Sequence, residues 1–373
     1  MHRCLELARL GAGYVAPNPM VGAVLVYGDK IIGEGWHKKY GEAHAEVNCI
    51  VSVKEEDKNL ISQSTLYVSL EPCGHFGKTP PCTDLIIKNK IPKVIIGCRD
   101  PFKEVNGVGI EKLQAAGVET EVGVMEKECK ELNKRFFTFS TQHRPYIILK
   151  WAQTADGKIA PPPPARGASE SSKDKMSFAQ RGSEVPPAEG FREASRLLIS
   201  NEYSNRLVHK WRSEEAAILV GTNTALLDNP ELTTRLWTGP SPIRLVVDMN
   251  LRLPASLNLF NGDVRTIIFN TVKQEEKENL LYYKLKKDRS LVTQLIPALY
   301  QLKIQSVLVE GGAKLLQSFI DNGLWDETRI INNDGLTAGE GLDAPKPGNR
   351  MFVESEKLFS DTIEIYMPAT DDY

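Results

Sequence analysis

The pattern of apolar and polar positions predicts alternating strands and helices in the first part of the chain. Two apolar runs within residues 21–37 flank Gly28–Asp29, which is typical of a β-hairpin. Beyond it, segments with helical spacing of apolar side chains are separated by short apolar runs of strand length. We expect helices at residues 2–13, 44–53 and 82–90, strands at 65–73 and 93–100, and a helix, turn and strand at 109–123. This alternation indicates a layered α/β domain with a largely parallel sheet, over residues 1–142.

A second alternating pattern predicts another α/β domain, over residues 143–373. We expect strands or strand–helix units at residues 144–160, 216–228, 242–249, 264–270 and 305–321, and one more strand at 361–369. Residues 161–196 interrupt this pattern, because they are rich in proline, glycine, serine and charge and almost lack β-branched side chains. Such a composition is typical of a flexible surface insert that packs poorly.

Composition and charge argue against several classes of protein. The 373 residues carry a net charge of −2, which does not favour a nucleic-acid binder or a protein bound to a membrane surface. No apolar run reaches membrane-spanning length, and the N-terminus has no signal-peptide pattern. Six cysteines are too few for a disulfide-rich secreted scaffold, so we expect reduced thiols and a cytoplasmic protein.

Two short motifs in the first domain carry the clearest candidate chemistry. His44 opens a predicted helix, Cys73 ends a predicted strand, and Cys82 opens the next helix. One imidazole and two thiolates form a three-ligand set for Zn²⁺ that leaves a fourth position for water, as in catalytic rather than structural zinc sites. Glu46 follows His44 by two residues, so we expect its carboxylate beside the metal, where a proton shuttle is needed. This H-x-E and P-C pattern is that of zinc nucleobase deaminases, with a longer gap between the cysteines.

Each of these residues also has a plainer explanation. His44 could simply begin a helix, Glu46 could be a solvated charge, and the cysteines could be small core residues. A structural zinc protein without chemistry is a further alternative. The motifs H-A-E and P-C-G-H-F-G-K-T-P-P-C rarely occur together by chance, however. The remaining cysteines have apolar surroundings and no partner motif, and we expect them in the core: Cys4, Cys49, Cys98 and Cys129.

On these motifs the chain resembles the bifunctional enzymes of riboflavin biosynthesis, which fuse a diaminohydroxyphosphoribosylaminopyrimidine deaminase to a 5-amino-6-(5-phosphoribosylamino)uracil reductase. The resemblance extends over APNPMVGAVLV (16–26), GEGWHKKYGEAHAEVN (33–48) and RDPFKEVNGVGI (99–110). It implies an N-terminal cytidine-deaminase-like layered domain and a C-terminal dihydrofolate-reductase-like α/β domain. The implied reactions are zinc-dependent deamination of 2,5-diamino-6-(5-phosphoribosylamino)pyrimidin-4-one and then NADPH reduction of its ribose to ribityl, which gives 5-amino-6-(5-phosphoribitylamino)uracil.

The resemblance also implies roles for residues of the first domain. The zinc ligands would be His44, Cys73 and Cys82, and the catalytic proton carrier would be Glu46. The substrate would be bound by Asn18, His37, His75, Lys78 and Asp100, with Asn18 on the pyrimidine edge and His75 and Lys78 near the ribose phosphate. Phe102 departs from the family, because many members have asparagine there.

In the second domain no G-x-G-x-x-G motif follows a strand, so a Rossmann cofactor site is not indicated. A predicted strand ends instead at Glu310, and Gly311–Gly312 turn into a helix whose free N–H groups can bind a pyrophosphate. The resemblance implies that the substrate is bound by Ser195, Arg212, Leu232, Arg235 and Glu310. It implies that NADPH is bound by Ala152, Leu198, Thr224, Asp228, Gly311, Gly312, Ala313 and Lys314. Leu198 stands where the family usually has tryptophan.

Two other functions remain open at this point. One is an active deaminase whose reductase domain is weak or inactive, because of Leu198 and the insert. The other is a tRNA-type zinc deaminase fused to a binding module, although the first domain has no evident basic face or aromatic platforms. The resemblance itself implies a small phosphoribosyl pyrimidine as substrate, homo-oligomers, and neither a nucleic acid nor a membrane as partner.

Overall fold

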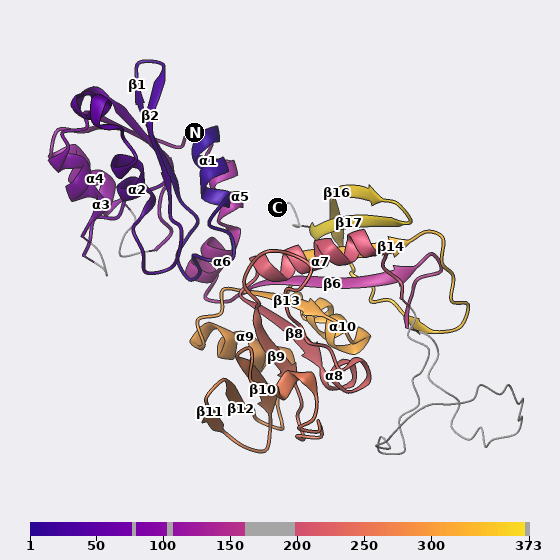
Figure 1. Cartoon of the computed structure of the whole chain (residues 1–373). Helices are drawn as coiled ribbons and strands as arrows, with labels where there is room; N and C mark the ends of the chain where they lie inside the picture. The colour runs from indigo at the N-terminus through magenta and orange to yellow at the C-terminus, as the bar shows by residue number, and fades with distance from the viewer. Residues whose placement is uncertain (77–79, 103–106, 161–197, 370–373) are drawn as a thin grey trace, which may run out of the picture.

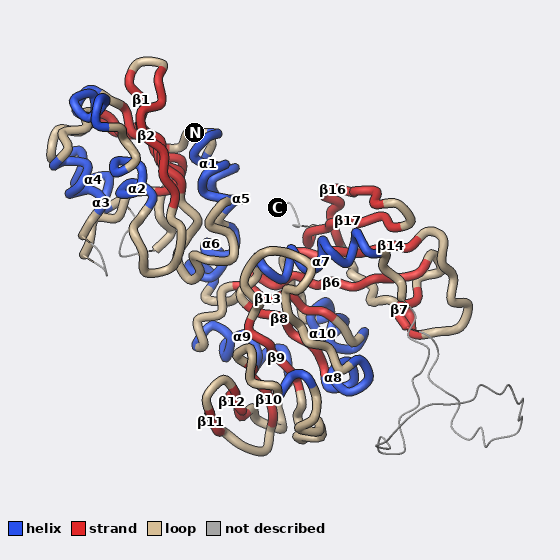
Figure 2. The backbone as a smooth tube through the Cα atoms, viewed as in Figure 1, coloured by secondary structure: helices blue, strands red, loops and turns tan. Residues whose placement is uncertain are grey.

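The computed structural model describes residues 1–76, 80–102, 107–160 and 198–369. Figures 1 and 2 show two groups of strands and helices, which meet where helix α6 (Lys134–Gln142) reaches the second group. The predicted insert at 161–196 lies outside the described residues. No helix within the described ranges has the length and apolar character needed to cross a bilayer.

The first sheet has five strands in the order β2-β1-β3-β4-β5. Their bounds are Gly22–Tyr27 (β1), Lys30–Trp36 (β2), Thr65–Leu70 (β3), Lys93–Cys98 (β4) and Glu119–Val122 (β5). Strands β3, β4 and β5 run parallel, whereas β1 is antiparallel to both β2 and β3. The expectation of a largely parallel sheet was therefore wrong here, because the predicted hairpin supplies both antiparallel pairings.

Helices cover both faces of this sheet. They are α1 (His2–Arg9), α2 (Ala45–Val51), α3 (Cys82–Lys88), α4 (Val108–Ala115) and α5 (Glu126–Leu132), with a 3₁₀ segment, η1, at Glu55–Gln63. On one face, α2, α3 and α4 bury Cys49, Ile86 and Leu113 against the strands. On the other face, α1 and α5 bury Leu5 and Cys129. Strand β4 is buried almost throughout because it lies between these layers.

The second sheet has ten strands in the order β11-β12-β10-β9-β8-β13-β6-β14-β17-β16. The seven strands from β12 to β14 in this order run parallel to one another, and the antiparallel pairings lie outside them, toward the two edges. The parallel strands are Tyr146–Thr154 (β6), Ala217–Gly221 (β8), Ile243–Val247 (β9), Thr266–Asn270 (β10), Leu280–Lys284 (β12), Ser306–Glu310 (β13) and Glu327–Asn333 (β14). The antiparallel strands are Glu275–Lys277 (β11) at one edge, and Asp361–Pro368 (β17) and Arg350–Leu358 (β16) at the other, where β16 is outermost.

Among the described residues, four helices pack on this sheet, α7 (Glu202–Glu214), α8 (Thr222–Asp228), α9 (Leu291–Gln301) and α10 (Ala313–Asp321). A 3₁₀ turn, η2, lies at Asn258–Phe260, and β7 (Lys158–Ala160) pairs with β15 (Leu342–Asp343). Helices α9 and α10 bury Leu295 and Phe319 on one face, and α7 buries Trp211 on the other. Because parallel strands end at one edge of a sheet, the carboxyl ends of β6, β8, β9 and β13 lie together.

Buried charges join α6 to the second sheet. Glu215 lies fully buried after α7, and the guanidinium of Arg135 on α6 donates from both Nε and Nη2 to its carboxylate, with an Nε–Oε2 distance of 2.7 Å. Lys134 reaches Glu327 of β14 at 2.9 Å. Because a buried charge is stable only when it is paired, these contacts fix the position of α6 against the sheet.

We predict that Glu215→Gln lowers the free energy of unfolding by about 3 kcal/mol, because it leaves the Arg135 charge without its partner in a desolvated site. Urea denaturation of the full chain would measure this loss. The matched control is Glu55→Gln, which breaks an exposed pair with Lys58 and should change stability by less than about 0.5 kcal/mol. An equally small effect of Glu215→Gln would contradict the prediction.

Candidate active sites

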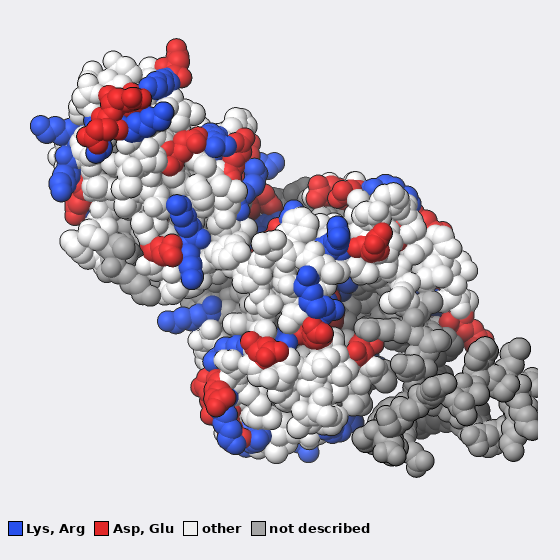
Figure 3. All heavy atoms as spheres, viewed as in Figure 1, with Lys and Arg blue, Asp and Glu red and all other residues white. Residues whose placement is uncertain are grey.

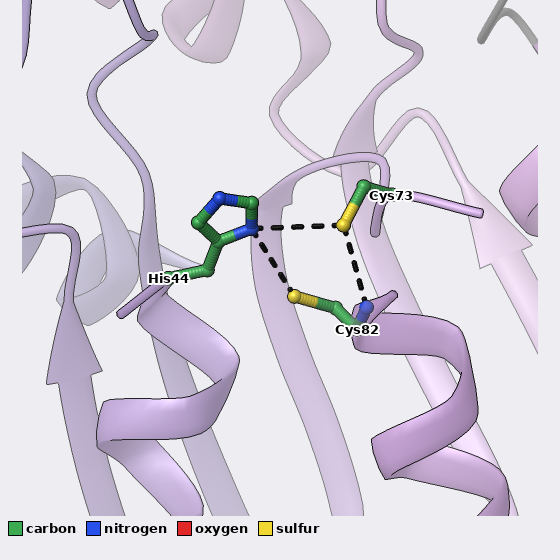
Figure 4. A group of neighbouring side chains, drawn as sticks. All are labelled: His44, Cys73 and Cys82. Atoms are coloured by element: carbon green, nitrogen blue, oxygen red, sulfur yellow. Dashed lines mark hydrogen bonds between the residues drawn. The ribbon is translucent and has the colours of Figure 1, made fainter. Parts of the chain in front are cut away.

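Two helix starts and one strand end bring the predicted metal ligands together. His44 is the residue before α2, Cys73 lies in the loop that follows β3, and Cys82 is the first residue of α3. The imidazole Nδ1 of His44 lies 3.3 Å from the sulfur of Cys82 and 3.6 Å from the sulfur of Cys73 (Figure 4). The three side chains point toward one another, and their ligand atoms all lie within 4.8 Å of each other.

These distances fit a tetrahedral zinc ion. With zinc–nitrogen and zinc–sulfur bonds of about 2.0 and 2.3 Å at tetrahedral angles, nitrogen and sulfur should be roughly 3.5 Å apart. The observed separations agree with this value. The main-chain N–H of Cys82, one of the free donors at the start of α3, also donates to the sulfur of Cys73 at 3.3 Å. The residues therefore suit one Zn²⁺, and three protein ligands leave a fourth position.

Hydrogen bonds between the two thiols and the imidazole favour one thiolate. The pKa of Cys73 is lowered to about 4, first by the hydrogen bond from Cys82 and further by His44. The pKa of Cys82 is raised, because it shares a proton with Cys73 and is buried. The imidazole of His44 has a raised pKa because it bonds to Cys73. This shared proton is the one that a metal would displace, since thiolates are the ligand form.

Glu46 lies in the first turn of α2 and is only 3% exposed. Burial raises its pKa to about 7, and the neighbouring charge of Cys73 contributes to the rise. A carboxyl group whose pKa is close to neutral can both take up and release a proton, as general acid–base chemistry requires. Glu46 shares with His44 and Cys73 the wall of a cavity of roughly 350 Å³.

The structure also brings Asn18, His37, His75 and Asp100 to this cavity. The ring Nδ1 of His37 lies 3.0 Å from the carbonyl of Ala43, and its Nε2 lies 3.1 Å from the amide nitrogen of Asn18. Burial lowers the pKa of His37, so the ring is neutral, donates to Ala43 and accepts from Asn18. Burial also raises the pKa of Asp100 to about 6. The predicted phosphate contact Lys78 lies outside the described residues.

Sequence reasoning missed residues that support or line the wall of this cavity. The buried carboxylate of Glu71 accepts the main-chain N–H groups of Asp100, Gly107, Gly109 and Ile110, at 3.1 to 3.4 Å. It therefore ties the segment that carries Asp100 to the end of β3. Phe136 of α6 also lines the cavity, as does Phe102. The one signal in the sequence was that Glu71 stands next to the P-C motif.

The second candidate site lies at the carboxyl edge of the ten-stranded sheet. Gly311 and Gly312 have φ angles of +109° and +73°, and α10 begins directly after them. A Cβ atom at Gly311 would come within 3.1 Å of the side chain of Thr224, so only glycine allows this approach of two segments predicted to bind the cofactor. Ala313 and Lys314 form the first turn of α10, where main-chain N–H groups have no partner within the helix.

Glu310 and Arg212, both predicted to bind substrate, form a part-buried ion pair. The guanidinium Nε and Nη2 of Arg212 each donate to the carboxylate of Glu310 at 2.8 Å. Lys150 of β6 lies 3.8 Å from the same carboxylate, and burial lowers the pKa of this lysine. The pKa of Glu310 is held at about 2, because the charges of Arg212 and Lys150 outweigh its desolvation. The site thus holds an ionised carboxylate between two cations.

Other predicted residues of this site are less closely gathered. Leu232 is 2% exposed within an apolar cluster, Arg235 bonds to Glu231 near the surface, and Leu198 is 75% exposed. Ala152 lies on β6 and Asp228 ends α8. Ser195 lies outside the described residues. His209, which sequence reasoning missed, accepts the main-chain N–H of Arg235 at 3.0 Å, and burial lowers its pKa to about 4.

Comparison with known families matches both halves of the chain. Residues 1–98 match the zinc-binding region of cytidine and deoxycytidylate deaminases, and residues 145–336 match the RibD C-terminal domain. The riboflavin biosynthesis protein RibD of Aquifex aeolicus is 39% identical over 98% of this chain and 94% of its own length. RibD of Escherichia coli is 32% identical over 93% of each chain.

Solved structures agree with these matches. A diaminohydroxyphosphoribosylaminopyrimidine deaminase/5-amino-6-(5-phosphoribosylamino)uracil reductase of Thermotoga maritima superposes with a TM-score of 0.83 at 36% identity, covering 99% of this chain and 97% of the other. RibD of Acinetobacter baumannii gives a TM-score of 0.81 at 28% identity, with 99% and 98% coverage. The predicted order, a cytidine-deaminase-like domain before a reductase domain, is confirmed.

We predict that the full chain binds one zinc ion and that Cys82→Ala abolishes this binding, because two remaining ligands cannot hold the metal. Elemental analysis of the purified variant would measure zinc content. Cys49→Ala is the matched control, since Cys49 lies on α2 within the core and should leave zinc content unchanged. Full zinc occupancy in Cys82→Ala would exclude the proposed ligand set.

Proposed function

The chain belongs to the RibD family of bifunctional riboflavin biosynthesis proteins, and we propose that His44, Cys73 and Cys82 hold its zinc while Glu46 carries the protons of the deamination. The protein is both a zinc-dependent deaminase and an NADPH-dependent reductase. The convergence of an imidazole and two sulfurs beside a buried carboxyl group carries the proposal. Because the relatives match both halves, a tRNA-type deaminase or an inactive reductase half is not favoured.

The deaminase reaction assigns one task to each group in the cavity. Zinc, when bound, supplies a Lewis acid that makes water nucleophilic near neutral pH. Glu46 takes a proton from the attacking water and delivers it to the leaving amine, since its buried carboxyl group lines the cavity beside the three metal ligands. Asn18, held by neutral His37, orients the pyrimidine edge. His75 lies exposed near the cavity and is proposed to meet the ribose phosphate together with Lys78.

We predict that Glu46→Gln reduces ammonia release from the diaminopyrimidine substrate by at least about 10³-fold, because the amide keeps the shape of the side chain but cannot carry a proton. A coupled ammonia assay would measure the loss. Zinc content and NADPH oxidation with the deaminated intermediate should stay at wild-type values, which separates lost chemistry from lost folding. Substantial ammonia release by this variant would rule out the assigned role.

For the reductase, the proposed substrate site is centred on the Glu310–Arg212 pair and the proposed cofactor site on Gly311–Lys314. NADPH, when bound, supplies the hydride. The free N–H groups that start α10 are suited to its pyrophosphate, with Thr224 packed against the glycines. The anionic carboxylate of Glu310 is suited to the hydroxyl groups of the ribose. Arg212 and Arg235 are proposed to meet the substrate phosphate, with Ser195, Leu232, Ala152, Leu198 and Asp228 around them.

We predict that Glu310→Gln slows NADPH oxidation with the deaminated intermediate by about 10²-fold or more, because it removes a charge that orders Arg212 and Lys150 as well as the contact to the ribose. Absorbance of NADPH would follow the reaction. Ammonia release serves as the internal control and should not change. If the wild-type chain released ammonia but oxidised no NADPH, the reductase assignment would be wrong for this protein.

Three further properties belong to this proposal. The two activities are assigned to residues 1–142 and 143–373, since each range contains one of the two large sheets. A homo-oligomer is supported by β16, an edge strand with exposed Met351, Phe352 and Val353, and light scattering would test it.

A cytoplasmic protein is supported by six unpaired cysteines, and cell fractionation would test it. Neither a nucleic acid nor a membrane is proposed as a partner, and positive and negative side chains are interspersed on the face in Figure 3.

A further inference from the structure

The segment Gly13–Met20, which carries Asn18, is held mainly by side chains from outside the deaminase cavity. The amide nitrogen of Gln305 donates to the carbonyl of Pro17 at 2.6 Å, although the two residues are 288 positions apart. Gln305 is 6% exposed and directly precedes β13 of the second sheet. Its own carbonyl accepts the N–H of Tyr146, so its main chain is fixed in that sheet. The side chain of Gln305, whose main chain is fixed in the second half of the chain, therefore holds Pro17, the residue next to Asn18.

Asn133 fixes the other end of the same segment. Its side-chain oxygen accepts the N–H of Met20 at 2.8 Å, and its amide nitrogen donates to the carbonyl of Met20 at 2.9 Å. Asn133 is 2% exposed and immediately precedes α6. The next two residues of α6, Lys134 and Arg135, form the ion pairs that fix this helix to the second sheet. This second anchor is thus tied to the same sheet as the first.

Gly13 provides a third contact with the second half. Its φ angle is +80°, and a Cβ atom added to it would lie 2.1 Å from the carbonyl oxygen of Ser213 at the end of α7. The two main chains can approach this closely only because residue 13 has no side chain. Ser213 directly follows Arg212, so the deaminase segment rests against the helix that supplies a proposed reductase residue.

We infer that Gln305 and Asn133 are positioning residues of the deaminase, which act by holding the segment that presents Asn18 to the pyrimidine. Between the two anchors, the side-chain amide of Asn18 lies 3.1 Å from Nε2 of His37, and both residues line the cavity. Pro17 directly precedes Asn18, and Met20 follows it by two residues. Displacement of either anchored residue therefore also moves the side-chain amide of Asn18. The inference rests on the proposed deaminase function, and it makes the second half of the chain part of the binding pocket of the first.

The test uses Gln305→Leu in the full chain, which keeps the volume of the side chain and removes its donor. Because Asn18 is proposed to bind the pyrimidine in both the ground state and the transition state, we expect KM for ammonia release to rise about tenfold and kcat to change less than twofold. Gln305→Glu should raise KM at least as much, because it places an acceptor against the Pro17 carbonyl. Zinc content and the kinetics of NADPH oxidation should match those of the wild type. The control Gln301→Leu removes a glutamine from α9 that bonds to Tyr283 instead of the segment, and it should have no effect.

A second pair of variants tests the same idea without changing Gln305. Gly13→Ala should also raise KM for ammonia release, because the new methyl group cannot fit against Ser213. Gly117→Ala is its control, since Gly117 has a similar φ of +81° but no atom within 4 Å of the place that a methyl group would take. An unchanged KM in both Gln305→Leu and Gly13→Ala would overturn the inference, as would a parallel loss of NADPH oxidation in Gln305→Leu, which would indicate general damage. Failure of the proposed function looks different, because the wild type would then release no ammonia.

Discussion

The deaminase site depends on the packing of two helix starts against one sheet. Strand β3 ends at the carboxyl edge of the first sheet, and α2 and α3 pack side by side on the same face with buried Cys49 and Ile86 between them and the strands. This packing alone brings His44 and Cys82, 38 positions apart, to 3.3 Å. The third ligand needs only the short turn from β3 to Cys73. The site is thus a consequence of core packing, and its ligands require no long side chains to meet.

The same packing sets the chemistry of the site. Glu46, in the first turn of α2, is 3% exposed, and burial is the main reason that its pKa is raised to about 7. At the second site the neighbouring charges outweigh desolvation. The cations Arg212 and Lys150 keep the carboxylate of Glu310 ionised there. The two sites therefore shift the pKa of a carboxyl group in opposite directions, upward for Glu46 mainly through burial and downward for Glu310 through the cations beside it.

The features that sequence reasoning predicted correctly are those with a local cause. The hairpin, the strand before Cys73, the helices that begin near His44 and Cys82, and the Gly311–Gly312 turn all follow from spacing and turn residues close together in the chain. The antiparallel pairing of β1 with β3 could not be predicted this way, because pairing partners are chosen by the whole sheet. Helix α6 also escaped prediction, because KRFFTFSTQ is rich in aromatic and β-branched residues of low helix propensity, and its ion pairs stabilise it instead. The bidentate pairing of Arg212 with Glu310 joins residues 98 positions apart and left no local pattern.

These distant contacts give a physical reason for keeping both activities on one chain. Phe136 lines the deaminase cavity from α6, the helix that is docked on the second sheet, and Gln305 of the second half holds the segment that carries Asn18, so the pocket is complete only when both halves are folded and docked. The docking itself relies on buried charges such as Glu215. Desolvation of this carboxylate costs free energy, and only its ion pair with Arg135 offsets that cost. Such an interface tolerates little displacement, because a shift that breaks one ion pair leaves a buried charge without a partner. A hydrophobic interface of the same size could slide and still remain stable. Ionic docking therefore suits a junction that must hold a substrate-binding segment in one position.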